Sequence, residues 1–205
     1  MYKNTLKRTF DLVISILVMP FFIIISLMVG LLIKREDKGP IFYTSKRLGK
    51  DKKTFNIYKF RSMKVNAPDI RNEDGSTFNA ENDPRITNIG KLIRKTSIDE
   101  LPQLLNVIKG DMSIVGPRPD TPEALKVYKG EESRKLEVRP GITGYNQAYF
   151  RNSIPQSQKF ENDVIYVDNV SFLFDCKIIL KTISSVVFRK NINNKVVKNA
   201  NESRS

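Results

Sequence analysis

The stretch Ser97–Pro119 reads SIDELPQLLNVIKGDMSIVGPRP and carries the most chemically informative residues of this 205-residue chain. Asp99 and Glu100 are adjacent carboxylates near the expected start of a helix, and Arg118 lies between two prolines. A carboxylate can serve as an acid, a base, a metal ligand or a nucleophile. A guanidinium on a proline-restricted backbone is well suited to binding phosphate or carboxylate groups. The stretch therefore predicts a polar site followed by an anion-binding turn.

The start of this stretch matches a capping box, because Ser97 is followed three residues later by Glu100. This pattern predicts that Asp99 and Glu100 occupy the first helical turn, where the helix dipole favours ionised carboxylates. Pro102 would then remove one hydrogen bond from that helix. The alternative is that Glu100 is only a cap and Asp99 only an acidic residue at a helix start.

The composition excludes several kinds of site. The chain has no histidine and one cysteine, Cys176, so a Ser-His-Asp triad, an intrachain disulfide and a Cys- or His-rich metal site are impossible. A metal site could use only oxygen ligands, which suit Mg²⁺, Mn²⁺ or Ca²⁺. The net charge of +13 favours an anionic partner: nucleic acid, anionic lipid or a phosphorylated substrate.

Residues 10–33 are nearly all apolar, and Pro20 lies near the middle of the segment. A helix of that length would be roughly 36 Å long, enough to cross a bilayer. Basic residues flank both ends, so the positive-inside rule favours neither orientation. The segment is either a re-entrant helix that bends at Pro20 and returns to the cytoplasmic side, or a kinked helix that spans the membrane. A charged segment, Lys34–Lys38, follows it without a cleavage site, which argues against a cleavable signal peptide.

The remaining pattern predicts an α+β fold: a mostly helical single domain with one β-hairpin, a membrane-inserted N-terminal helix and amphipathic interfacial helices. Its expected parts are a hairpin over 40–62, a loop over 64–85, two helices within 86–109 parted near Thr96, a charged helix over 121–138, a turn over 138–144 and an amphipathic helix over 171–188. We expect three units: a membrane element at 1–38, a cytoplasmic catalytic domain at 39–188 and a disordered basic tail at 189–205.

Several cations are candidate anion ligands. Strand alternation places Lys59 on the same face as Phe55 and Ile57, so Lys59 is either a solvated edge residue or a residue that points into a site. Three arginines lie next to turn-forming or aromatic residues: Arg118, Arg139 and Arg151. Each is either a surface arginine or a ligand for an anion.

Five segments in this order resemble a known family. They are KRTFD (7–11), GPIFYTSKRLGKDKKTFNIYKFRSM (39–63), RKTSIDELPQLLNVIKGDMSIVGPRP (94–119), RPGITG (139–144) and FENDVIYVDNVSFLFD (160–175). This order is similar to that of the bacterial sugar transferases, the monotopic phosphoglycosyl transferases of the minimal catalytic type. The resemblance covers roughly residues 5–188.

The resemblance implies a monotopic enzyme on the cytoplasmic face of the bacterial inner membrane, with residues 1–38 as a membrane-inserted re-entrant helix. It would transfer a sugar-1-phosphate from a UDP-sugar to undecaprenyl or another polyprenyl phosphate and release UMP, in the first membrane step of polysaccharide or glycoconjugate synthesis. By this likeness Asp99 is the nucleophile, forms an aspartyl phospho-sugar intermediate and lies near Mg²⁺, and Glu100 assists. The expected phosphate and substrate ligands are Lys59, Arg94, Arg118, Arg139 and Arg151.

Two departures from the family pattern bear on this interpretation. A Met19-Pro20 pair stands where the family has Ser-Pro at the bend of its re-entrant helix. Tyr149 and Phe150 replace an Asn-Gly pair, so the sequence does not name the sugar. The alternatives are a glycosyltransferase that releases UDP, a non-catalytic membrane scaffold, and a nucleic-acid-binding protein, which the apolar N-terminal segment disfavours. Self-association is left open.

Overall fold

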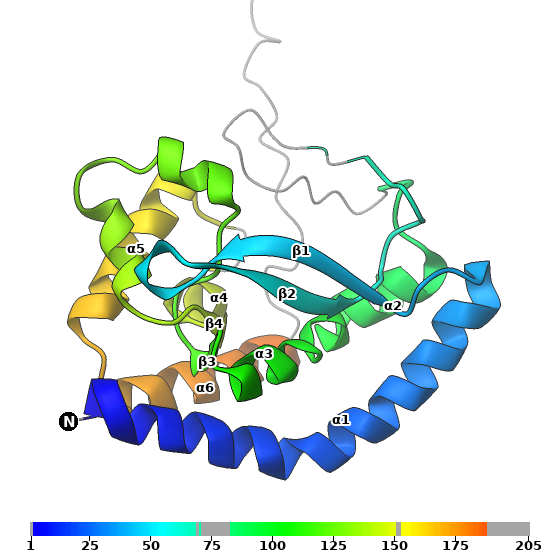
Figure 1. The fold of residues 1–205 in the computed structure, drawn as a ribbon, viewed down its shortest axis with the longest axis horizontal. Helices are drawn as coiled ribbons and strands as arrows, with labels where there is room; N and C mark the ends of the chain where they lie inside the picture. Colours follow the sequence, from blue (N-terminus) through cyan, green and yellow to red (C-terminus); the bar gives the residue numbers. More distant parts are fainter. Residues whose placement is uncertain (1, 69, 71–82, 151–152, 188–205) are drawn as a thin grey trace, which may run out of the picture.

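The computed structural model describes residues 2–68, 70, 83–150 and 153–187 (Figure 1). The predicted tail at 189–205, Arg151 and much of the predicted loop at 64–85 lie outside the described residues. The α-helices are α1 (Lys7–Asp37), α2 (Asn88–Lys95), α3 (Gln103–Lys109), α4 (Tyr145–Tyr149), α5 (Gln156–Asp168) and α6 (Phe172–Val187). The strands are β1 (Phe42–Leu48), β2 (Thr54–Phe60), β3 (Ser113–Val115) and β4 (Gly141–Thr143). Short non-α helical turns are Tyr2–Leu6, Lys50–Lys52, Ile98–Glu100, Pro122–Lys126 and Gly130–Glu137.

The predicted fold class is confirmed: the chain is α+β, mostly helical, with a long apolar N-terminal helix and a β-hairpin. Strands β1 and β2 pair antiparallel from Phe42 opposite Phe60 to Leu48 opposite Thr54. The connecting turn has Asp51 at a φ of 55°, as the tight reversal requires. The two predicted helices within 86–109 are present as α2 and α3, and the second ends at Gly110 with a φ of 95°.

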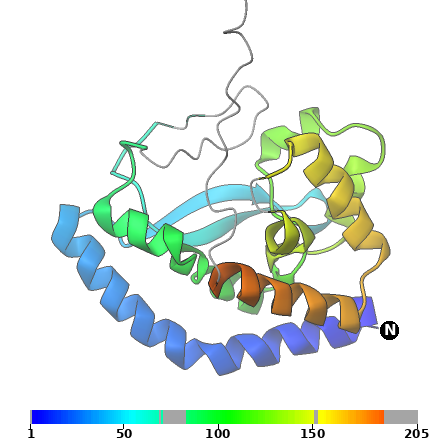
Figure 2. The same cartoon turned by 180° about the vertical axis from the view of Figure 1, so that it is seen from behind.

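Helix α1 is continuous through Pro20 and bends in its central part (Figures 1 and 2). In both views the rest of the described chain lies on one side of it. Its inner face buries Phe22, Val29 and Ile33 in a core shared with Phe60, Ile93 and Leu104. Its other faces expose a set of large apolar side chains: Phe10, Val13, Ile16, Leu17, Phe21, Ile23, Ile24, Leu27, Met28, Leu31 and Leu32. Among the described residues, α1 is the helix long and apolar enough to cross a membrane.

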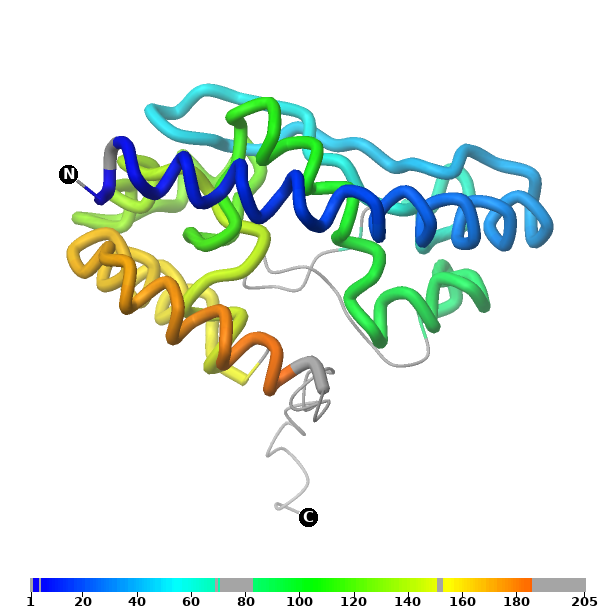
Figure 3. Tube along the Cα trace, turned by 90° about the horizontal axis from the view of Figure 1, so that it is seen from below, coloured from blue at the N-terminus to red at the C-terminus, as the bar shows by residue number. Residues whose placement is uncertain are grey.

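Polar contacts fix the N-terminal end of α1. Lys7 Nζ lies 2.6 Å from Asp175 Oδ2 on α6. Arg8 donates to the carbonyl oxygens of Val107 and Ile108 at 2.5 and 3.0 Å, at the end of α3. The tube view from below shows that α6 begins near the N-terminal end of α1 and then runs away from it (Figure 3). We call these contacts, with those of Asp11 to β3, the N-terminal clamp.

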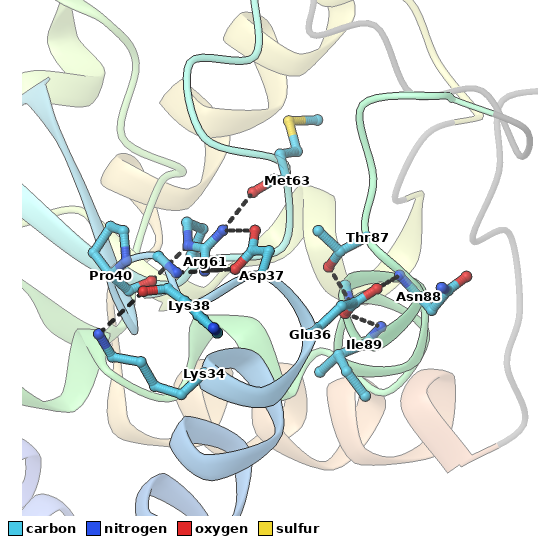
Figure 4. A network of polar contacts seen from close by, with 12 residues as sticks. Lys34, Glu36, Asp37, Lys38, Pro40, Arg61, Met63, Thr87, Asn88 and Ile89 are labelled. Carbon is cyan, nitrogen blue, oxygen red and sulfur yellow. Dashed lines mark hydrogen bonds and ion pairs between the residues drawn. The ribbon is translucent and has the colours of Figure 1, made fainter.

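A second set of contacts fixes the opposite end of α1 (Figure 4). Arg61, just after β2, forms a bidentate ion pair with Asp37 and donates to the Pro40 carbonyl at 2.5 Å. Glu36 accepts hydrogen bonds from the Asn88 and Ile89 N–H groups at 2.7 and 3.0 Å, where α2 begins. We call this set the C-terminal clamp. Both ends of α1 are therefore held by the same folded body.

The second half of the chain differs from the sequence prediction. Residues 121–138 form two 3₁₀ segments, not one helix, and the predicted turn at 138–144 contains β4, which pairs in parallel with β3. The prediction was wrong because both strands are three residues long, too short for alternation to show. Helices α4 and α5 were not predicted. They pack with α6 around Tyr166 and Ile178, which contribute to a second core.

Candidate active site

The predicted capping box is not formed. Ser97 adopts a left-handed φ of 58° and its side chain caps nothing, while residues 98–100 form a 3₁₀ turn. Helix α3 begins only at Gln103, with Pro102 as its N-cap. The physical reason is that Pro102 has no N–H to donate to the Ile98 carbonyl and its ring clashes with that carbonyl, which costs about 3 kcal/mol in a helix that began at Ser97. Asp99 and Glu100 therefore lie on a separate turn ahead of α3.

The Glu100 carboxylate receives two cations from distant elements. Lys59 Nζ of β2 lies 2.7 Å from Glu100 Oε1, and Arg118 Nη2 lies 3.2 Å from the same oxygen. The side chains of Lys59 and Glu100 are only 19% and 20% exposed. Lys59 is therefore a residue that points into a site, which the sequence had left open. Burial alone would raise the pKa of Glu100, but the charges and hydrogen bonds of Lys59 and Arg118 outweigh it and lower that pKa to about 2.

Asp99 has the opposite character. Its burial and the neighbouring charge of Glu100 raise its pKa to about 6, against the opposing charges of Lys59, Arg94 and Arg118. Within the described residues, no hydrogen bond or ion pair engages the Asp99 carboxylate, whereas Glu100 has two partners. Two adjacent carboxylates whose pKa values are driven apart are suited to different chemical roles.

Three of the predicted cations gather at this turn. Arg94 on α2 acts on Asp99 by its charge, and Lys59 and Arg118 contact Glu100. The Arg118 side chain is 53% exposed, so its guanidinium has room for a further anionic partner. We call Asp99, Glu100, Lys59, Arg94 and Arg118 the carboxylate–cation cluster. It joins β2, α2, the 3₁₀ turn and the loop after β3.

Arg139 lies elsewhere in the structure. Its Nε donates to the Gly110 carbonyl oxygen at 2.8 Å, at the C-terminal end of α3, and it lies near Arg8. Asp99 precedes the N-terminal end of the same helix. A role for Arg139 in binding substrate stays a prediction, as does one for Arg151, which lies outside the described residues.

The comparison with protein families matches residues 2–189 to the model described as bacterial sugar transferase. The chain belongs to this family. It is 44% identical over 187 residues to the uncharacterized sugar transferase EpsL of Bacillus subtilis, a match that covers 91% of this chain and 90% of that protein. It is 42% identical to the undecaprenyl-phosphate galactose phosphotransferase of Salmonella typhimurium, over 90% of this chain but 41% of that longer protein. It is 38% identical to the UDP-N-acetylgalactosamine-undecaprenyl-phosphate N-acetylgalactosaminephosphotransferase of Aeromonas hydrophila, over 89% of this chain and 44% of that protein.

Sequence analysis of this sugar transferase missed the support behind Arg118. Asp120 lies two residues after Arg118. Its carboxylate accepts hydrogen bonds from Lys135 Nζ at 2.6 Å and from the Tyr128 hydroxyl at 2.9 Å. Lys135 is buried and also contacts Asp163 Oδ2 at 2.5 Å. The backbone of this loop is held as well, because the Leu48 N–H donates to the Asp120 carbonyl at 2.8 Å. Lys135 lies in a charged run, EESRK, that gives no signal of burial.

Few side chains at this site of the sugar transferase could bind a metal ion. Among the described residues no group of three or more His, Cys, Asp or Glu side chains comes together. Glu100 is already engaged by two cations, so Asp99 is the carboxylate available to an ion. Mg²⁺ commonly binds one or two carboxylates together with substrate phosphate oxygens. The residues therefore fit an ion that arrives with a phosphorylated substrate, and the assignment of Asp99 as a Mg²⁺ ligand stays a prediction.

Proposed function

We propose that this protein is a phosphoglycosyl transferase that moves a sugar-1-phosphate from a UDP-sugar to polyprenyl phosphate, such as undecaprenyl phosphate, and releases UMP. The names of the relatives from Salmonella typhimurium and Aeromonas hydrophila support the substrate classes. The observation that carries the mechanism is the contrast within the carboxylate pair. Asp99 has no hydrogen-bond or ion-pair partner among the described residues and a raised pKa, while Glu100 is held by two cations.

In the first proposed step an Asp99 carboxylate oxygen attacks the phosphorus that carries the sugar. A bond forms between that oxygen and phosphorus, and the bond from phosphorus to the oxygen of UMP breaks, so that UMP leaves with the electron pair. An aspartate with a pKa of about 6 is more basic than an ordinary one and is still ionised at neutral pH. Both properties favour a carboxylate nucleophile.

In the second step a phosphate oxygen of the polyprenyl phosphate attacks the aspartyl phospho-sugar. The Asp99–phosphorus bond breaks, the carboxylate is regenerated, and the lipid-linked diphosphosugar is the product. Lys59, Arg94 and Arg118 would offset the negative charge of the phosphoryl groups in both steps. Mg²⁺, held by Asp99 and substrate phosphates, would further reduce repulsion between the anionic nucleophile and the anionic donor.

Glu100 is better suited to hold cations than to accept a proton. Its pKa of about 2 makes it a weak base, and its Oε1 already accepts from both Lys59 and Arg118. We therefore assign Glu100 the role of fixing these two cations beside Asp99. Removal of its charge would free both cations and lower the pKa of Asp99.

The clamps at the two ends of α1 support a monotopic, re-entrant arrangement on the cytoplasmic face of the cell membrane. A straight 31-residue helix would be about 46 Å long and, if it spanned the bilayer, would place its ends on opposite sides. Both ends instead contact the same folded body. We propose that the exposed apolar faces of α1 enter one leaflet, and that the clamps hold the bend where this chain lacks the family's serine before Pro20.

Nucleotide release tests the reaction. Purified protein in nanodiscs would receive Mg²⁺, undecaprenyl phosphate and a panel of UDP-sugars, beside the Asp99→Asn and Glu100→Gln variants. We expect wild type to release UMP, Asp99→Asn to release none, and Glu100→Gln to be slower by about 10²–10³-fold, since it loses the electrostatic arrangement but not the nucleophile. Release of UDP would show transfer of the sugar alone and refute the proposal. No release with any donor would favour the scaffold alternative.

Cysteine labelling tests the topology. A Cys176→Ser background would carry a single cysteine at Lys3 or at Lys38, on either side of α1. A membrane-impermeant maleimide would be applied to intact spheroplasts and to inverted vesicles. We expect both positions to react only in inverted vesicles. Reaction of one of the two positions in spheroplasts would show that α1 spans the membrane.

A further inference from the structure

Asn106 lies at the contact between the strand that carries Lys59 and the helix that follows the catalytic turn. It is fully buried at 0% exposure and belongs to α3. Its Oδ1 accepts from the Tyr58 N–H at 3.0 Å, and its Nδ2 donates to the Asn56 carbonyl at 2.8 Å. Nδ2 also donates to Asp111 Oδ2 at 3.2 Å, so both amide hydrogens are used.

This carboxamide pairs with β2 as a peptide group of a third strand would. In an antiparallel pair, alternate residues direct their N–H and C=O groups towards the partner strand and away from it. The Asn56 carbonyl and the Tyr58 N–H both point to Asn106. These two backbone groups therefore lie on the edge of β2 that does not face β1. Within the described residues that edge has no strand neighbour, because the hairpin is a two-stranded sheet. Asn106 therefore satisfies two backbone groups of β2 that have no strand partner on this edge.

The other contacts between β2 and α3 are an exposed one, in which Lys109 at the end of α3 donates to the Tyr58 hydroxyl, and apolar packing. Ile57 packs with Val107 and Met112 in a small buried cluster. Such packing holds the two elements together but is non-directional, whereas a hydrogen bond fixes position to within a few tenths of an ångström. Lys59 is the next residue after Tyr58 and reaches Glu100 at 2.7 Å. The position of its Nζ thus depends on where β2 lies along α3.

We propose that Asn106 is a positioning residue: its carboxamide fixes β2 on α3 and so places Lys59 against Glu100 beside the nucleophile. The proposal rests on the transferase activity proposed above for its kinetic readout, but not for its structural one. A displacement of about 1 Å in a positioning group can reduce turnover by as much as 10²-fold. Removal of the carboxamide should therefore reduce kcat more than it changes KM.

A double-mutant cycle tests the kinetic part, with Asn106→Leu, Lys59→Met and the double variant. Leucine has the same number and branching of side-chain heavy atoms as asparagine but no hydrogen-bonding groups. We expect Asn106→Leu to lower kcat/KM by about 10–100-fold in the wild-type background and by less than about 3-fold when Lys59 is already methionine, because coupled residues are not additive. Val107→Ala, one residue away and equally buried, is the matched control for lost stability. It should reduce kcat/KM by the same factor in the wild-type and Lys59→Met backgrounds. An undiminished effect of Asn106→Leu in the Lys59→Met background would overturn the proposal.

Lysine labelling tests the structural part without any turnover. Acetylation of Lys59 by an amine-reactive ester would be followed by peptide mass spectrometry, with exposed Lys50 as the internal reference. We expect Lys59 to react several-fold faster in Asn106→Leu than in wild type or Val107→Ala, with Lys50 unchanged. Equal Lys59 rates in Asn106→Leu and Val107→Ala would refute the proposal even if the enzyme is active. If wild type shows no turnover, the proposed function fails while this measurement still decides the role of Asn106. Should leucine prevent folding, Asn106→Ala serves, because a water can then occupy the vacated space.

Discussion

Asp99→Asn should make this protein more stable while it abolishes transfer. Burial and the Glu100 charge raise the pKa of Asp99 from 3.8 to about 6, so its ionised form is disfavoured in the folded state. Because the folded pKa lies above the unfolded one, the cost to stability is absent below pH 4 and complete above pH 6. Asparagine keeps the shape of the side chain and removes that cost.

The magnitude follows from the pKa difference. A rise of roughly two pKa units corresponds to at most about 2.7 kcal/mol, and screening by solvent at this partly exposed turn can lower it to about 1.5 kcal/mol. For a chain of this size, we expect the melting temperature at pH 7.5 to rise by about 3–10 °C. At pH 4 the rise should largely vanish, because Asp99 is then protonated in the folded protein.

Thermal melts of wild type, Asp99→Asn and the exposed control Glu131→Gln would be recorded from pH 4 to 8 in one detergent, beside the UMP assay. The control should change the melting temperature by less than about 1 °C at every pH, because exposed charge contributes little. A loss of stability in Asp99→Asn at pH 7.5, or a gain of equal size at pH 4, would refute the assignment of Asp99 as a strained, ionised nucleophile. A loss of stability with no loss of activity is what the helix-cap alternative predicts.

Other consequences of the structure can be measured in the same preparations. The kcat/KM of wild type should fall about tenfold per pH unit below about pH 6, since protonated Asp99 cannot attack; a profile flat down to pH 4 would contradict this. Lys135→Met should reduce the unfolding free energy by about 3–5 kcal/mol in denaturant titrations, because it leaves two carboxylates facing each other beside the Arg118 loop, whereas Arg134→Met on the surface should cost less than about 1 kcal/mol. Equal losses of unfolding free energy in Lys135→Met and Arg134→Met would show that burial of Lys135 is unimportant. Gly116→Ala would place a Cβ 2.4 and 2.8 Å from backbone atoms that lead into β4, so expression or activity should collapse, while Gly30→Ala meets only the flexible end of a side chain at 3.1 Å and should be tolerated.

Local patterns predicted the hairpin and the two helices around the carboxylate turn because their signals lie within short windows. Alternating β-prone residues with a Gly-Lys-Asp turn marked β1 and β2, and helical spacing marked α2 and α3. The same reasoning failed at Ser97, where the capping-box pattern was overridden by Pro102. It also failed at β4, whose three residues form a strand only because β3 lies beside them.

The sequence by itself determined which chemistry was possible. A chain without histidine, with one cysteine and with an Asp-Glu pair ahead of a proline-bounded arginine can rely only on carboxylates and cations, and its apolar segment requires burial in protein or lipid. Only the tertiary structure decided how the two carboxylates differ. Lys59 and Arg118 reach Glu100 from positions 41 and 18 residues away, and no local pattern contains those distances. Because pKa values depend on which charges and how much solvent surround a group, Asp99 and Glu100 acquire separate roles only when the chain folds.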